Sequence, residues 1–213
     1  MDLFSYLLGR KSGGGSGEVL LQDKTITENG EYTADTGYDG LGKVTVEVAG
    51  SGGIAAGISY DEFDSLGNLA KATVYGSQVQ KNAFYEQRNL TTVNFANDIT
   101  AIGGSAFYRC NALTLSELPP NITQILDYTF NSCSNITITA IPSGVTRILS
   151  DAFRYCYAIT ELTFKGTPTE ISANAFRNCG NLTVINVPWA EGAVANAPWG
   201  ATDATINYNY TGA

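Results

Sequence analysis

The stretch AFRYCYAIT, residues 152–160, contains one of only four cysteines in this chain of 213 residues. The other three are Cys110, Cys133 and Cys179, and each cysteine lies 23 residues from the next. The chain has no histidine and a single methionine. Chance would not place all four of its cysteines at one fixed interval. A fixed interval indicates an internal repeat, which is the first feature to test in a sequence of unknown fold.

Other residue types keep the same interval. Phenylalanine recurs three residues before each cysteine position, three aliphatic columns share the register, and two hydroxyl columns do so as well. The phenylalanines are Phe84, Phe107, Phe130, Phe153 and Phe176. The hydroxyl columns are Thr91, Thr114, Thr137, Thr160 and Thr183, and Ser77, Thr100, Thr123, Thr146 and Thr169. Five units therefore cover residues 74–188, more than half of the chain.

A unit this short, with so few apolar positions, cannot bury its own apolar face, so the units are expected to stack as a solenoid. Within a unit, Leu-Thr-x-x-x-Phe suits a short strand, and a proline turn follows at Pro119, Pro142 and Pro168. A second short strand comes next, and a segment such as SDAFRYC, residues 150–156, suits a turn of helix. The predicted fold is mainly β with short helical turns, in about five coils capped at both ends and preceded by a small β module.

Two stretches carry a resemblance to a known family. ISANAFRNCGNLTVINVP at 171–188 and IGGSAFYRCNALTLSELP at 102–119 are similar to the signature IxxIxxxAFxxCxxLTxIxLP of BspA-like leucine-rich repeats. The first unit departs from it, with Gln87 where the cysteine is expected, as terminal coils often do. The resemblance implies a leucine-rich-repeat solenoid. Repeats of this family are commonly associated with bacterial surface adhesins.

The cysteine column has three interpretations. A structural zinc site needs ligands paired at short spacing, which this chain lacks. A disulfide needs two converging side chains, whereas equivalent residues on successive coils point in parallel. We therefore favour small buried side chains in the interior. The threonine columns suit half-buried strands, although they could also display hydroxyl groups to a ligand.

Candidate binding residues break the period just after the repeated phenylalanine. Tyrosine and arginine carry many binding hot spots, although an ordinary amphipathic surface shows them too. These residues are Tyr85, Tyr108, Arg109, Arg154, Tyr155 and Arg177. Trp189 and Trp199 lie beyond the repeats, where they would cover the open end of the apolar column or, alternatively, form a platform for carbohydrate.

Glycine-rich connectors divide the rest of the chain. Residues 1–17 are a docking peptide and linker, 18–49 a small β module with a hairpin at Asn29-Gly30, and 50–56 a second linker. Residues 57–73 form an N-terminal capping hairpin, and 189–213 a C-terminal cap. The attachment residues of the peptide are Leu3, Phe4, Tyr6, Leu7 and Leu8.

The stretch ITENGEYTADTGYDGLGKVTVEV resembles a module of phage and prophage structural proteins, and PWAEGAVANAPWGAT is similar to the ending of other phage-associated repeat proteins.

Composition narrows the possible partners. Apolar residues make up 44% of the chain, enough for a core, and the net charge of −8 opposes binding to nucleic acid or anionic lipid. No run is apolar and long enough to insert into a membrane. The apolar stretch at the N-terminus precedes Arg10 and Lys11, opposite to a secretory signal, so we expect it to be retained.

These observations favour a binding protein over an enzyme. There is no histidine for acid–base chemistry and no nucleophile or phosphate-binding motif, and no cofactor is predicted. The first hypothesis is a phage or prophage virion protein, attached to other virion proteins through residues 1–49 and presenting its repeats to a host-surface protein or glycan. The alternative is a bacterial cell-surface adhesin, against which the absence of a signal peptide argues. A homo-oligomer is possible, and residues 57–213 are expected to fold alone.

Overall fold

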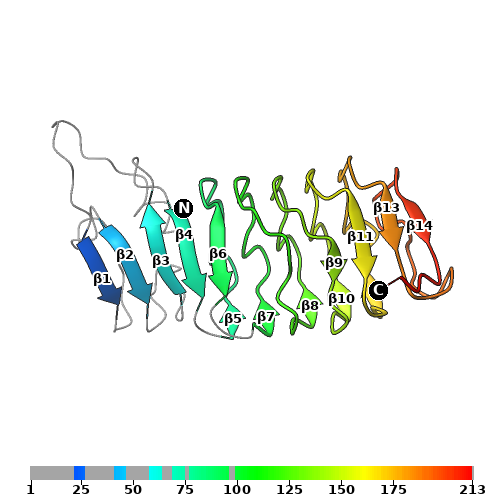
Figure 1. Ribbon diagram of the computed structural model, residues 1–213, viewed down its shortest axis with the longest axis horizontal. Coiled ribbons are helices and arrows are strands. Elements are labelled where there is room, and N and C mark those ends of the chain that lie inside the picture. Colours follow the sequence, from blue (N-terminus) through cyan, green and yellow to red (C-terminus); the bar gives the residue numbers. More distant parts are fainter. Residues whose placement is uncertain are drawn as a thin grey trace. The chain divides into compact units, whose positions relative to one another are not determined.

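The computed structural model describes residues 22–26, 41–46, 58–63, 69–74, 77–95 and 99–212, with side chains from residue 69 onward. The five attachment residues, the two linkers and the Asn29-Gly30 turn lie outside this part of the chain. The molecule divides into two compact units. One contains strands β1 to β4 and β6, and the other contains the remaining strands (Figure 1).

The first unit is a five-stranded sheet in the order β1-β2-β3-β4-β6. β1 pairs parallel with β2, β2–β3 and β3–β4 are antiparallel, and β4 pairs parallel with β6. The strands are β1 (Gln22–Ile26), β2 (Leu41–Val46), β3 (Ile58–Phe63), β4 (Leu69–Val74) and β6 (Thr92–Phe95). Because β2 and β3 belong to one sheet, the small β module and the capping hairpin share backbone hydrogen bonds; the domain boundaries stay predictions.

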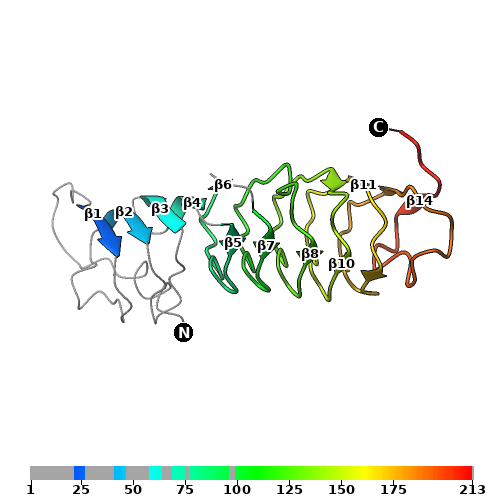
Figure 2. The same ribbon diagram turned by 90° about the horizontal axis from the view of Figure 1, so that it is seen from below.

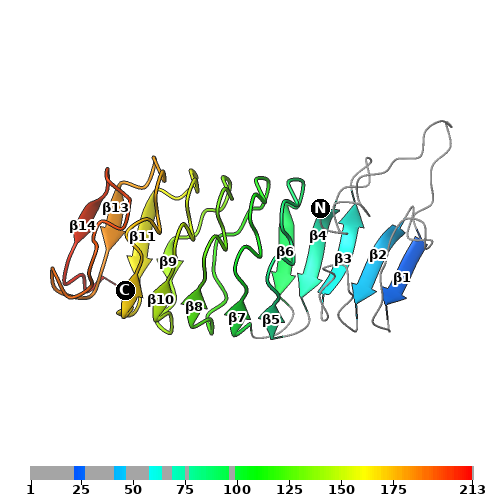
Figure 3. The ribbon, with the colours of Figure 1, turned by 180° about the vertical axis from the view of Figure 1, so that it is seen from behind.

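The second unit is a solenoid of parallel strands, as the repeat predicts. Arg147 lies between Gln124 and Glu170, which occupy the same register position one coil before and one coil after it. Equivalent residues of successive coils are therefore direct neighbours, and Figures 2 and 3 show these coils one after another. One sheet is β5-β7, with β5 (Gln78–Val79) and β7 (Ala101–Ile102). A second is β8-β10-β12, with β8 (Gln124–Ile125), β10 (Arg147–Ile148) and β12 (Glu170–Ile171). The third is β9-β11-β13-β14, with β9 (Ala140–Ile141), β11 (Glu161–Phe164), β13 (Val184–Asn186) and β14 (Thr205–Asn207).

The phenylalanine column forms the centre of the solenoid. All five rings are fully buried, and each stacks on the next with centroid distances of 5.1, 5.4, 5.5 and 5.3 Å along the chain. Burial of an aromatic side chain contributes a few kcal/mol, and a favourable ring pair adds about 0.5–1.5 kcal/mol. A residue that repeats at the coil interval can make the same contact at every step, which is why the period is so strict.

The cysteine column is internal, and its thiols are free and buried. Each Sγ donates a hydrogen bond to the carbonyl of the phenylalanine 26 residues earlier, at 3.0, 2.9, 3.2 and 2.9 Å along the chain. Burial raises the pKa of each thiol, that of Cys179 to about 12. Within the described residues no three potential ligands come together as a metal site would need. The prediction of buried cysteines is confirmed, with a hydrogen bond that the sequence did not reveal.

The threonine columns are exposed, but several of their hydroxyl groups already have backbone partners. Thr100, Thr146 and Thr169 each donate from Oγ1 to the carbonyl one coil earlier, at 3.3, 3.1 and 3.1 Å. Thr183 donates to the carbonyl of Thr160 at 3.4 Å. These bonds support the structural interpretation of the columns.

The segment around each phenylalanine is not helical, which corrects the predicted helical turns; no helix occurs in the described part of the chain. In one coil, the amides of Ala106 and Tyr108 bond three residues back, to Gly103 and Ser105. The alternate amides, of Ser105 and Phe107, bond to Asp127 and Thr129 of the next coil. A helix needs every amide for its own ladder, whereas here half of the amides join neighbouring coils.

Trp199 continues the phenylalanine column at the C-terminal end. It lies one repeat interval after Phe176, whose amide bonds to its carbonyl at 2.9 Å. The indole is fully buried, and its Nε1 donates to the carbonyl of Ala195 at 2.7 Å. Trp189 packs edge-on to Trp199 at 6.2 Å and is 6% exposed. The two tryptophans therefore close the apolar column.

Candidate binding face

The side chains that leave the solenoid at its turns come from one backbone position. The second residue after each phenylalanine has a left-handed backbone, with φ between 58° and 63°, and none of these side chains is buried. They are Glu86, Arg109, Ser132, Tyr155 and Asn178. Left-handed residues other than glycine are uncommon and carry a cost. Here the conformation recurs coil after coil, and the residue type varies freely. We call the surface formed by these residues and their exposed neighbours the turn face.

Three tyrosines and an ion pair form the first part of the turn face. Tyr85 and Tyr108 stack at 4.9 Å with an interplanar angle of 13°, and Tyr128 meets Tyr108 edge-on at 6.5 Å. Arg109 places its guanidinium 5.2 Å from the centre of the Tyr108 ring and bonds to the Glu86 carboxylate at 2.9 Å. This hydrogen bond raises the pKa of Arg109. We call these five residues the tyrosine cluster. These contacts join the three rings and the cation into one cluster.

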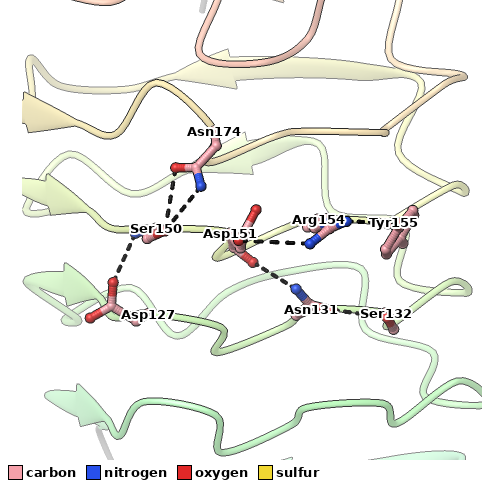
Figure 4. Close-up of polar contacts among 8 residues, drawn as sticks. All are labelled: Asp127, Asn131, Ser132, Ser150, Asp151, Arg154, Tyr155 and Asn174. Carbon is pink, nitrogen blue, oxygen red and sulfur yellow. Dashed lines mark hydrogen bonds and ion pairs between the residues drawn. The ribbon is translucent and has the colours of Figure 1, made fainter.

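Arg154 and Tyr155 form the second part of the turn face. The Arg154 guanidinium lies 4.6 Å from the centre of the Tyr155 ring, and its Nη2 donates to the phenol oxygen at 2.8 Å. This bond is the main cause of the lowered pKa of Tyr155. Nη1 lies 3.9 Å from the buried carboxylate of Asp151 (Figure 4). Arg154 is thereby fixed between a carboxylate beneath it and an aromatic ring at the surface.

Polar side chains join the coil of this arginine to the coil before it and to the coil after it. Asn131 is buried and donates to the carbonyl of Asp151 at 3.4 Å, and it accepts from the Ser132 hydroxyl at 2.9 Å (Figure 4). One coil further on, Asn174 donates to Ser150 Oγ at 3.0 Å. Because the bonds of Asn131 and Asn174 to the coil of Arg154 span successive coils, they fix the spacing of the turns that carry the exposed residues.

A shallow groove of about 210 Å³ crosses three coils beside Tyr155. It is lined by Asn111 from one coil, Ser132 and Ser134 from the next, and Tyr155 and Tyr157 from the third. The two rings lie 6.0 Å apart and are tilted by 48°. We call these five residues the serine–tyrosine groove. All five side chains are uncharged, and each carries a hydrogen-bonding group.

Comparison with known proteins identifies the repeat. Residues 77–192 match the BspA type leucine rich repeat region in six copies, which is more than half of the chain. The chain belongs to this family. Among solved structures, it is similar to a leucine rich cell surface protein from Faecalibacterium prausnitzii A2-165, with 26% identity and a TM-score of 0.56. The match covers 67% of this chain and 40% of that one, so this chain spans well under half of that protein. No curated protein matches.

The residues predicted from the sequence to bind a ligand occupy four different settings in the structure. Tyr85, Tyr108 and Arg109 belong to the tyrosine cluster, and Arg154 and Tyr155 form the second pair. Arg177 is exposed one coil further on. Trp189 and Trp199 are buried, which agrees with the capping role and leaves no exposed ring for the alternative, a carbohydrate platform.

Two exposed residues of the BspA-type turns were missed by sequence reasoning. Tyr128 is 40% exposed and Tyr157 is 46% exposed, and both contact predicted residues. Tyr128 occupies a second left-handed column, two residues before the phenylalanine, where other coils have Asn82, Ser105 and Asp151. The sequence signal that could have revealed Tyr128 is a tyrosine at a register position where the other coils have small polar residues.

Proposed function

We propose that this BspA-type chain is a non-enzymatic binding protein of the adhesin type that recognises its ligand through the turn face. The observation that carries the proposal is the tyrosine cluster, in which stacked rings and a paired arginine are held on the outside of a rigid stack. Tyrosine and arginine are enriched at binding hot spots, and preorganised side chains lose less entropy on binding. A repeat scaffold tolerates changes on such a face because the column residues inside stay the same.

The relative from Faecalibacterium prausnitzii supports display at a bacterial surface, because it is described as a cell surface protein. This favours the adhesin over the virion protein, which the comparisons do not support. Attachment to other virion proteins through residues 1–49 rests on the resemblances noted above. This attachment remains a prediction. If it is right, deletion of residues 1–17 should release the protein from purified particles, which fractionation of the particles can measure.

The thiols support a role without catalysis. The thiolate is the reactive form of cysteine, and burial keeps all four thiols protonated by raising their pKa. The sequence has no histidine that could act as their base. The residues that face solvent at the turns are instead those suited to recognition.

A combined glycan and protein array with the full-length chain tests the proposal. The turn face is altered in Tyr108→Ala/Arg109→Ala, which removes the centre of the tyrosine cluster, and separately in Tyr157→Ala. Thr160→Ala, on an exposed threonine column, is the matched control. At least one turn-face variant should lose about tenfold or more in affinity for the ligand found, with the control unchanged. Retention of binding by both turn-face variants would contradict the proposal.

A further inference from the structure

The serine–tyrosine groove differs in chemistry from the rest of the turn face. The tyrosine cluster contains charged groups, whereas the five residues that line the groove are all neutral. An anionic ligand such as a phosphate or sialic acid would need a cation. The nearby Arg154 already engages the Tyr155 phenol and lies beside the Asp151 carboxylate. The lining therefore favours an uncharged ligand.

The hydrogen bonds within the groove determine what it offers outward. Ser134 donates its hydroxyl proton to the carbonyl of Asn111 at 3.2 Å, and Ser132 donates to the side chain of Asn131 at 2.9 Å. Asn111 donates from Nδ2 to the carbonyl of Ser132 at 3.0 Å. Since a hydroxyl oxygen that has donated its proton still has lone pairs, the serines present acceptors to a ligand. A ligand that carries donors, such as hydroxyl groups, matches them.

The two tyrosines supply an apolar surface next to these acceptors. Tyr157 is 46% exposed, and its ring is inclined to that of Tyr155, so the pair forms an angled wall. Tyr155 is held by Arg154, which bonds to its phenol oxygen and lies against its ring. Aromatic surface next to a few fixed polar groups is the usual composition of a small-ligand site. A pyranose ring has the complementary surfaces, because one side of it is largely C–H and its rim carries hydroxyl groups.

We infer that the serine–tyrosine groove binds a neutral sugar residue of a surface glycan. With about 210 Å³, the groove is smaller than the roughly 300–1,000 Å³ sites of drug-sized molecules. It therefore accepts one sugar ring and leaves the rest of the glycan in solvent. The inference rests on the proposed function and makes it specific, because it assigns the ligand class to one part of the turn face.

An array of neutral oligosaccharides ending in galactose, N-acetylglucosamine, mannose or fucose, with sialylated and sulfated counterparts, tests the inference on the full-length chain. The wild type should bind at least one neutral glycan and none that requires the anionic group. Tyr157→Ala and Ser134→Ala should each weaken this binding at least about tenfold, while Tyr157→Phe should retain most of it. Tyr210→Ala, another exposed tyrosine outside the groove, is the control.

Thermal unfolding of each variant separates loss of binding from loss of fold, and Tyr157 is exposed enough to be replaced without unfolding the chain. Absence of binding to any neutral glycan, binding only to anionic glycans, or full binding by Tyr157→Ala would overturn the inference. If a protein ligand is found instead and only the Tyr108→Ala/Arg109→Ala variant loses it, the groove inference fails and the proposed function stands.

Discussion

At the scale of single residues, each buried cysteine both fills space in the interior and donates a hydrogen bond to another coil. Cysteine is small enough to fill the space beside the phenylalanine column, and its Sγ can donate to a carbonyl of the preceding coil. The carbonyl of Phe107, which accepts from the Sγ of Cys133, also accepts from the amide of Cys110 at 3.1 Å, so alanine at Cys133 would fill the space less well and remove one of the two hydrogen bonds of that carbonyl. The sequence showed the burial of this column but not the hydrogen bond, because the acceptor is a backbone group of another coil.

The buried thiols predict a loss of stability at high pH. A solvated thiol has a pKa of about 8.5, whereas burial raises the pKa of Cys179 to about 12. Below about pH 8.5 both states keep the proton. Above it the unfolded chain alone releases the proton until the pKa of the folded state is reached. The free energy of unfolding should therefore fall with rising pH, by up to about 1.4 kcal/mol per pH unit for each thiol.

Urea unfolding at pH values from about 8 to 11 measures this slope. Tyrosine and lysine also titrate in this range, so the informative quantity is the difference between the wild type and Cys156→Ala. In the variant, the free energy of unfolding should fall less steeply with pH, and the difference in slope should equal the contribution of one thiol. Equal slopes would mean that the Cys156 thiol is not protected in the folded state.

At the scale of the element, the turn around each phenylalanine depends on residues in the left-handed region. Asn82 has φ of 60° and an exposed side chain. A β-branched residue tolerates this backbone poorly, whereas glycine adopts it freely. Asn82→Val should therefore destabilise the protein by about 1–2 kcal/mol, and Asn82→Gly should change stability by a few tenths. A chemical denaturation series compares the two, and equal effects would show that the backbone there is not strained.

Where neighbouring coils approach closely, a turn has no room for a side chain and needs glycine. A Cβ on Gly103 would overlap the backbone of Gln80 and Lys81, whereas one on Gly180 would meet nothing within 4 Å. Gly103→Ala should force neighbouring coils apart and lower the melting temperature by several degrees, as a loss of about 1–3 kcal/mol does. Gly180→Ala should leave it nearly unchanged. Similar melting temperatures for the two variants would contradict the packing described for the Gly103 turn.

At the scale of the solenoid, the final coil must cover the end of the apolar column. Trp199→Ala would leave a large cavity beside Phe164 and Trp189, so it should cost about 3–5 kcal/mol. Trp199→Phe, which retains a ring in the column, should cost clearly less. Hydrogen exchange should locate the loss of protection in β13 and β14 first, because repeat coils depend on their neighbours. Uniform loss along all coils would mean that Trp199 does not act as a cap.

Much of this fold could be predicted because a repeat makes distant contacts visible as periods in the sequence. The phenylalanine and cysteine columns are read in this way, and the position of Trp199 one repeat interval after Phe176 is equally readable. The turns could not be assigned, because SDAFRYC has a composition suited to a helix while its alternate amides bond to another coil. Tyr128 is exposed on a left-handed residue of such a turn, which composition does not show. The serine–tyrosine groove draws its residues from three coils, so no single unit of the sequence reveals it.

The central claim is that the repeated residues are internal and that recognition is left to the residues at the turns. Reaction of the full-length chain with a soluble thiol reagent tests it most directly, because all four cysteines belong to one repeated column. In the native state we expect the four thiols to react at the slow rate of unfolding, and in denaturant all four should react at once. Rapid labelling of several thiols in the native protein would show that the column is open to solvent and would contradict the account.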